Sequence, residues 1–303
     1  VMPLPLRTSR AGRPAVPAQL TETSVEIKEN HDNPTTTDPR PVAPPAVRPA
    51  SGRGAWFALG AVVTVLAVAF AAVSAVAWLA RQSEHQHQVY RQRITRLVMD
   101  VDTGDVTIRR GGDGIVDVRR HLVWSWTKPE IEESWDGDTL RTRVRCPVIT
   151  LGPGCGVDFA IQVPDGTAVE LRTDTGDIRV SNLTSAGVTA VTDTGDVVVT
   201  NAGGTVKLRT DTGDIRASEL TATEVTAVTD TGDVGLRFVR PPDRVVATVD
   251  TGDVSITVPQ SDPYRVTSRT DTGKVTVSVA NDPNAIRTID ARTDTGDVRV
   301  RGT

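Results

Sequence analysis

The residue pattern most suggestive of chemistry in this sequence is a repeated Asp-Thr-Gly. The tripeptide occurs eight times; seven copies continue as Asp-Thr-Gly-Asp, and the copy at Asp271 continues with a lysine. Asp-Thr-Gly is the active-site signature of the aspartic proteases, in which two carboxylates share a proton and activate water. The eight copies begin at Asp102, Asp174, Asp193, Asp211, Asp230, Asp250, Asp271 and Asp294.

Aspartic protease chemistry requires two such loops to face each other across one cleft. After a first gap of 72 residues, the copies here recur at spacings of 19, 18, 19, 20, 21 and 23 residues, so we expect them to stack side by side along one edge. The flanking residues in RTDTGD and VTDTGD are polar, whereas the protease loop follows a buried apolar strand. We therefore predict that the chain is not an enzyme and that it has no catalytic residues and no cofactor.

Calcium binding is the second chemistry that a ladder of aspartates suggests, because calcium prefers hard oxygen ligands. The spacing differs from the Gly-Gly-x-Gly-x-Asp repeat of calcium-binding solenoids, and neighbouring arginines such as Arg172 and Arg179 would oppose a metal ion. We favour a surface salt ladder, because carboxylates about 5 Å apart repel each other by roughly 1 kcal/mol in water and arginines can relieve this. The candidate calcium ligands are Asp174, Asp177, Asp193, Asp196, Asp211, Asp214, Asp230 and Asp233.

The elements that must position these aspartates are short β-strands. Apolar residues alternate with polar ones before each motif, as in Val206 and Leu208, and after it, as in Val254 and Ile256. Alternation with period two predicts a strand with one buried face, and the glycine between two such strands permits a tight turn. Residues 171–197 and 208–234 agree at 22 of 27 positions, which indicates duplication of a two-coil unit. We predict an all-β fold, a β-solenoid of stacked coils with about 20 residues each.

A single apolar segment precedes these repeats. Residues 56–80 contain no charged residue, and as a helix they would be about 37 Å long, which is enough to cross a hydrocarbon core of about 30 Å. Trp56 and Trp78 lie near its two ends, where indole rings favour the membrane interface. Because some 55 residues precede it and it is long, we predict a transmembrane helix and not a cleaved signal peptide.

These features divide the chain into four regions. We expect a disordered, proline-rich tail over 1–54, a transmembrane helix over 55–81, a juxtamembrane linker over 82–96 that continues the helix for a few turns, and a β-repeat domain over 97–303. The arginines flanking the helix are nearly balanced, so the positive-inside rule does not orient it. We place the N-terminus inside because the cysteine pair and the repeats lie downstream.

Two cysteines, Cys146 and Cys155, lie nine residues apart in CPVITLGPGC. In an oxidising compartment this spacing, with no histidine nearby, favours one disulfide over a metal site, and two unpaired thiols are the alternative. His85 and His87 are two residues apart and do not share a helix face, which favours a solvated surface over a metal site. Leu122, Trp124 and Trp126 alternate along one strand, which favours a core role over an exposed aromatic binding strip.

From about Leu97 to its end, the chain resembles a bacterial putative adhesin family, β-strand repeat domains of unknown function. The resemblance is carried by the motif VMDVDTGDVTIRR, the strand WDGDTLRTRV, and the stretch VDFAIQVPDGTAVELRTDTGDIRVSNL followed by Gly-Asp-Val/Ile coils. Members of this family often follow one transmembrane helix. The chain departs from the family in the uniformity of its Asp-Thr-Gly-Asp turns and in its cysteine loop. The resemblance implies no enzymatic activity and no established functional residues.

The composition suggests the source and limits the partners. Only four of the 34 basic residues are lysines, which favours a high-GC bacterium and, with the resemblance, an actinobacterial source. The net charge of −4 and the absence of a clustered basic stretch argue against nucleic acid as a partner. We predict a membrane-anchored, extracytoplasmic binding or structural module of the cell envelope, with an envelope protein or polymer as its partner. The alternative is an accessory or sensor protein in envelope-stress signalling, in which the proline-rich tail contacts a cytoplasmic regulator.

Overall fold

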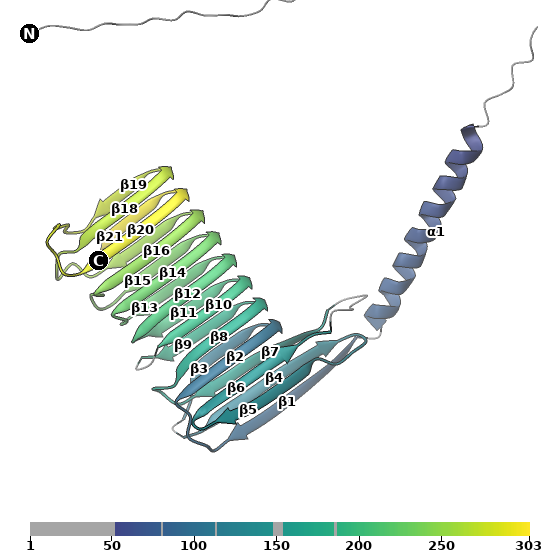
Figure 1. Ribbon diagram of the computed structural model, residues 1–303, viewed down its shortest axis with the longest axis horizontal. Coiled ribbons are helices and arrows are strands. Elements are labelled where there is room, and N and C mark those ends of the chain that lie inside the picture. Colours follow the sequence, from purple (N-terminus) through teal and green to yellow (C-terminus); the bar gives the residue numbers. More distant parts are fainter. Residues whose placement is uncertain (1–51, 80, 113, 148–153, 185–186) are drawn as a thin grey trace, which may run out of the picture. The chain divides into compact units, whose positions relative to one another are not determined.

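The computed structural model describes residues 52–79, 81–112, 114–147, 154–184 and 187–303 (Figure 1). One α-helix, α1 (Gly52–Leu79), is followed by 21 β-strands. The expected tail over 1–54 lies almost entirely outside the described residues.

Helix α1 is apolar and is not covered by protein. The 18-residue window Leu59–Val76 has a mean hydropathy of 2.5, and none of it is buried. Large side chains such as Leu66 and Phe70 are 64% and 76% exposed. Among the described residues, this is the one helix long and apolar enough to cross a membrane.

The strands form two open sheets that enclose one apolar core. In spatial order, sheet A consists of β1 (Gln82–Tyr90), β4 (Val116–Trp124), β7 (Gly156–Val163), β3 (Val106–Arg110), β9 (Ile178–Leu183), β11 (Val197–Ala202), β13 (Ile215–Leu220), β15 (Val234–Phe238), β17 (Val254–Val258), β21 (Val298–Gly302) and β19 (Val275–Ser278). In the same way, sheet B consists of β18 (Arg265–Thr272), β20 (Thr288–Thr295), β16 (Arg244–Thr251), β14 (Glu224–Thr231), β12 (Thr205–Thr212), β10 (Val188–Thr194), β8 (Ala168–Thr175), β2 (Arg96–Thr103), β6 (Thr139–Arg145) and β5 (Glu130–Asp136).

Each coil is a strand of sheet B, an Asp-Thr-Gly-Asp corner and a strand of sheet A, as in β12 followed by β13. Successive coils pair in parallel and in register, so that Val188, Val206 and Val225 stack as neighbours. Their side chains are at most 1% exposed, as are most others at inward positions. The apolar residues that alternate along each strand thus form a core between the two sheets, and the predicted β-solenoid is confirmed.

The last two coils do not stack in sequence order. The C-terminal coil, β20 and β21, lies between the coil of β16 and β17 and the coil of β18 and β19. Its inward residues Val298 and Val300 are fully buried, whereas Val275 and Val277 in β19 are 44% and 37% exposed. Our expectation that each repeat covers the next along the chain is therefore wrong at this end. The more apolar coil occupies the interior and the more polar one closes the stack.

The expected juxtamembrane linker over 82–96 is also wrong in part. Residues Gln82–Tyr90 do not continue the helix but form β1, which pairs antiparallel with β4 from Gln82–Trp124 to Tyr90–Val116. QSEHQHQVY lacks an apolar alternation that would predict a strand. The strand forms at the edge of sheet A because β4 offers it a complete partner. Beyond the end of β4, Trp126 is 56% exposed, while Leu122 and Trp124 belong to the core.

Candidate functional site

The second aspartate of each motif binds the main chain of the neighbouring coil. The Oδ1 atom of Asp177, for example, accepts a hydrogen bond of 2.8 Å from the backbone N–H of Asp196. The same bond recurs from coil to coil at 2.8–3.0 Å, and we call this row the aspartate spine. Its carboxylate acceptors are Asp158, Asp105, Asp177, Asp196, Asp214, Asp233, Asp253 and Asp297.

The spine explains the one motif that departs from the pattern. In the terminal coil, the backbone N–H of Lys274 donates to Asp297, which completes the row. No described coil lies beyond β19, so a carboxylate at position 274 would have no backbone amide from which to accept a hydrogen bond. Lysine at this position is consistent with its place at the end of the stack, and charged side chains on an edge strand also discourage further pairing.

Glycine and threonine complete each corner. Gly195 has a φ of +147°, and a Cβ atom there would lie 2.1 Å from the carbonyl oxygen of Gly176 in the preceding coil. The buried hydroxyl of Thr192 donates to that same carbonyl oxygen at 3.0 Å. Sequence reasoning missed this threonine, although its recurrence before the first aspartate in RTDTGD and VTDTGD was a signal for it. The equivalent threonines are Thr173, Thr210, Thr229, Thr270 and Thr293.

Arginines neutralise the spine in pairs of coils. The Arg179 guanidinium lies 2.7 Å from Asp177 and 3.5 Å from Asp105, so that it bridges two coils. Arg216 bridges Asp214 and Asp196 in the same way, and Arg299 bridges Asp297 and Asp253. The amide of Asp297 and the guanidinium of Arg299 together lower the pKa of Asp253.

The first aspartates form a separate row on the outer face of sheet B. Burial and the carboxylates of Asp193 and Asp102 raise the pKa of Asp174, the opposite direction from Asp253. Arg172 approaches Asp193 at 3.2 Å, and Arg209 lies 2.8 Å from Asp211. Arg292 stands two residues before a first aspartate, as Arg172 does, but it pairs with Asp290 on its own strand.

The eight candidate calcium ligands are thus divided between two rows. Asp177, Asp196, Asp214 and Asp233 belong to the spine, where one oxygen of each carboxylate binds an amide. Asp174, Asp193, Asp211 and Asp230 lie on the outer face of sheet B, three of them within 3.5 Å of an arginine. Among the described residues, no group of three or more His, Cys, Asp or Glu side chains could hold a metal ion.

We expect calcium to leave the stability of the protein unchanged. A site with a Kd of about 1 mM would add about 1.4 kcal/mol at about 10 mM calcium, which would raise the melting temperature by several degrees. Thermal unfolding of the full chain in calcium and in excess chelator measures this. Coincident unfolding curves are the expected result. A melting temperature that rises with calcium would instead support calcium binding by these aspartates.

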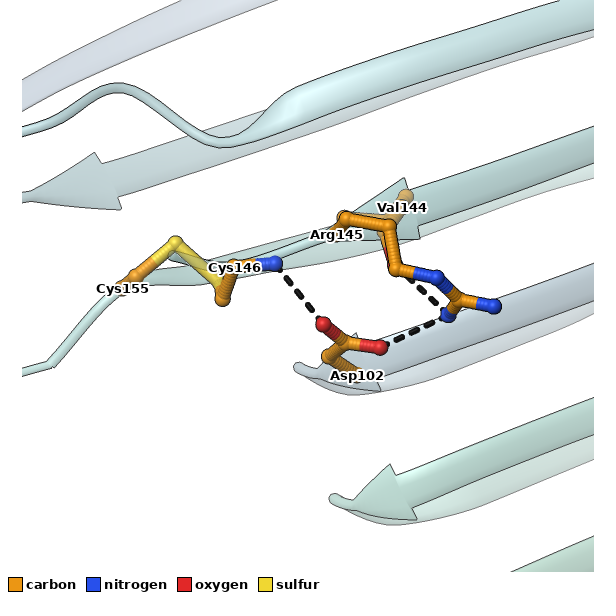
Figure 2. Close-up of a disulfide and its surroundings, with 5 residues drawn as sticks. All are labelled: Asp102, Val144, Arg145, Cys146 and Cys155. Carbon is orange, nitrogen blue, oxygen red and sulfur yellow. Dashed lines mark hydrogen bonds and ion pairs between the residues drawn. A yellow bond between two sulfur atoms is a disulfide. The ribbon is translucent and has the colours of Figure 1, made fainter. Parts of the chain in front are cut away.

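The cysteine pair lies at the corner of the first coil, between β6 and β7 (Figure 2). The two sulfur atoms are bonded, with the Cα atoms 5.7 Å apart. Beside them, Asp102 accepts a hydrogen bond of 2.8 Å from the backbone N–H of Cys146 and one of 2.7 Å from Arg145. This coil has no Asp-Thr-Gly-Asp motif, and here the disulfide joins the end of β6 in sheet B to the start of β7 in sheet A, where the other coils have the motif.

A hollow of about 500 Å³ lies on the outer face of sheet A at the same end. We call it the histidine hollow. The rings of His85 and His121 stack with centroids 4.3 Å apart, and Ala160 and Thr107 lie among its lining residues. His121 Nδ1 is 3.6 Å from Asp158, so an imidazole and a carboxylate lie side by side in the hollow. Because β1 is a strand, His85 and His87 share a face after all, and both line it.

The fold and these sites define a class of protein: an open β-solenoid whose repeated aspartates hold its coils together. Residues 157–301 match the family described as Toastrack DUF4097. The resemblance of the sequence to a β-strand repeat family of unknown function is thereby confirmed. A comparison with curated proteins finds no match.

Solved structures show distant likenesses. A putative cell adhesion protein from Clostridium sporogenes is 11% identical, with a TM-score of 0.39, 73% of this chain covered and 100% of that one. A putative adhesin from Bacteroides fragilis is 14% identical, with a TM-score of 0.42 and coverages of 73% and 97%. A putative lipid binding protein from Parabacteroides distasonis is 8% identical, with a TM-score of 0.33 and coverages of 73% and 95%.

Proposed function

We propose that the protein is a membrane-anchored, extracytoplasmic binding or structural module of the cell envelope, adhesin-like and non-enzymatic. The observation that carries this proposal is the junction of helix and solenoid. The exposed apolar helix ends at Leu79 and β1 begins at Gln82. Three peptide steps span at most about 11 Å, so a helix crossing a bilayer would hold the first coil at the membrane surface.

Two further features support this proposal. Disulfides persist in oxidising compartments, which favours the extracytoplasmic side for Cys146 and Cys155. The spine offers a rigid, repetitive surface with an open hollow, which suits binding to an envelope protein or polymer more than enclosing a reaction. In the proposed domain plan, residues 1–54 form a cytoplasmic tail, residues 55–81 contain the anchor, and the solenoid extends from 82 to 303.

Epitope tags at the two ends of the full chain test this topology. On intact protoplasts, an antibody should label a tag placed after Thr303 and should reach an N-terminal tag only after the membrane is permeabilised. The opposite labelling pattern would reverse the orientation. Release of the protein by alkaline carbonate would show that the helix does not anchor it.

A further inference from the structure

Sheet A presents one straight row of outward side chains, each two residues after an aspartate of the spine or, in β19, two residues after Lys274. The row is continuous in register across nine strands. From β7 to β19 it consists of Ala160, Thr107, Arg179, Val198, Arg216, Gly235, Ser255, Arg299 and Thr276. Two neighbouring pairs in the row have small side chains: Ala160 with Thr107, and Gly235 with Ser255. The residues between these two pairs are larger, so each pair forms a dip in the surface.

Each of these dips lies in a hollow. The first is the histidine hollow. The second, which we call the Gly235 hollow, has a volume of about 410 Å³ and includes Gly235, Ser218 and Ser255 in its lining. Gly235 follows the second duplicated segment directly, and it corresponds to Val198, 37 residues earlier, which follows the first. The hollow therefore lies where one coil has glycine and the corresponding coil has valine.

Charge pairing also breaks at the Gly235 hollow. Three arginines bridge six of the eight spine carboxylates, and Asp158 lies beside His121. In this coil the bridging position is Gly235, and Asp233 has no arginine among the described ion pairs. Arg237, which also lines the hollow, has no carboxylate within 4.0 Å in the described part of the chain. Among the described residues, this hollow thus contains a carboxylate and a guanidinium that form no close ion pair, together with two serine hydroxyls.

The two hollows lie on one face and along one line. Five strand steps separate β7 from β15, which at roughly 4.8 Å per step is about 24 Å. A small molecule cannot occupy both hollows, but a linear polymer can. Arg237 at the second hollow would attract negative charge, as would Arg119 at the first, although Arg119 also lies 3.2 Å from Asp117. Aspartates and hydroxyls beside them can bind hydroxyl groups.

We propose that the outer face of sheet A binds a linear acidic polysaccharide, with one acidic sugar in each hollow. The guanidinium of Arg237 binds the anionic group of the sugar, and Asp233 with Ser255 binds its hydroxyls. This inference rests on the proposed function as a binding module, and it names the class of ligand and the face that binds it.

Binding of polygalacturonate to the full chain in detergent, measured by calorimetry, tests the proposal with two matched pairs of variants. Arg237→Gln should weaken binding at least tenfold, whereas Arg244→Gln, which removes an unpaired exposed arginine on sheet B, should not. Gly235→Val should weaken binding to a similar extent. The nearest protein atom to a Cβ at Gly235 is 4.0 Å away, so this variant should remain folded. Its control is Thr226→Val on the outer face of sheet B.

Three further probes separate this site from simple adsorption. Dextran has the hydroxyls without the charge and polyphosphate has the charge without hydroxyls, so both should bind at least tenfold more weakly than polygalacturonate. Oligogalacturonates too short to span about 24 Å should also bind more weakly, since they cannot occupy both hollows. Equal binding of polyphosphate, or unchanged binding by Arg237→Gln and Gly235→Val, would overturn the proposal. Neither result would affect the tag-labelling test, which depends on topology alone.

Discussion

Replacement of Gly213 by alanine is expected to lower the melting temperature by about 8 °C or more, a loss of more than about 4 kcal/mol. Gly213 has a φ of +144°, and a Cβ atom there would lie 2.1 Å from the carbonyl oxygen of Gly195. The backbone strain alone costs about 1–3 kcal/mol. Relief of the collision would separate two coils and break the spine bond between Asp214 and Asp196, since both lie at the same corner.

Gly166→Ala is the matched control for that variant. Gly166 also has a positive φ, +86°, but nothing lies within 4 Å of the Cβ position. This variant should lose only about 1 kcal/mol, or a few degrees. Thermal unfolding followed by circular dichroism measures both. Equal, small losses in the two variants would show that the coils do not pack as closely as the structure has them.

Arg120→Met is expected to cost about 3–5 kcal/mol, because it leaves a carboxylate buried without its counter-ion. The Arg120 side chain is 6% exposed, and its guanidinium lies 2.9 Å from Glu133 and 3.2 Å from Gln88. The hydroxyl of Tyr90 also donates a hydrogen bond to Glu133. The partial burial of Tyr90 and this hydrogen bond together raise the pKa of Tyr90 to about 12. The network links β1 and β4 in sheet A with β5 in sheet B, at the end of the solenoid nearest the helix in sequence.

Two further variants show whether the cost comes from the buried charge. Arg119→Met removes an arginine that is 63% exposed and should cost less than about 1 kcal/mol. The double variant Arg120→Met, Glu133→Met removes both charges and should recover much of the loss, since an apolar pair of similar volume often replaces a buried ion pair without penalty. Urea unfolding of the three proteins measures this. A double variant less stable than Arg120→Met would contradict the explanation.

The sequence was sufficient to predict the solenoid because its signals are local and repeated. Alternating residues such as Val206 and Leu208 mark the strands, and Gly213 marks the corner between them. The place of the C-terminal coil could not be predicted in this way, since β18 and β20 carry nearly the same motif. Lys274 marks the terminal coil most clearly. Its meaning depends on knowing that an aspartate at this position accepts a hydrogen bond from an amide of the next coil.

Contacts between distant residues account for the rest of what the sequence did not predict. The stacking of His85 on His121 joins residues 36 positions apart, and no periodicity around His85 indicates that β1 is a strand. The Gly235 hollow was within reach of sequence analysis, because the duplicated unit has valine at the equivalent position. What the sequence lacked was the register that places Gly235 beside Ser255 and between two arginines.

The repeated aspartates act as acceptors for the main chain of the next coil, and amide hydrogen exchange of Asp214→Ala tests this role most directly. The Asp233 amide donates to Asp214 at 2.8 Å, whereas the Asp196 amide donates to Asp177, which is unchanged. A hydrogen bond to a charged group contributes about 1.5–3 kcal/mol. We predict exchange roughly tenfold or more faster at Asp233, with Asp196 unaffected. Unchanged exchange at Asp233 in a folded Asp214→Ala protein would contradict the account.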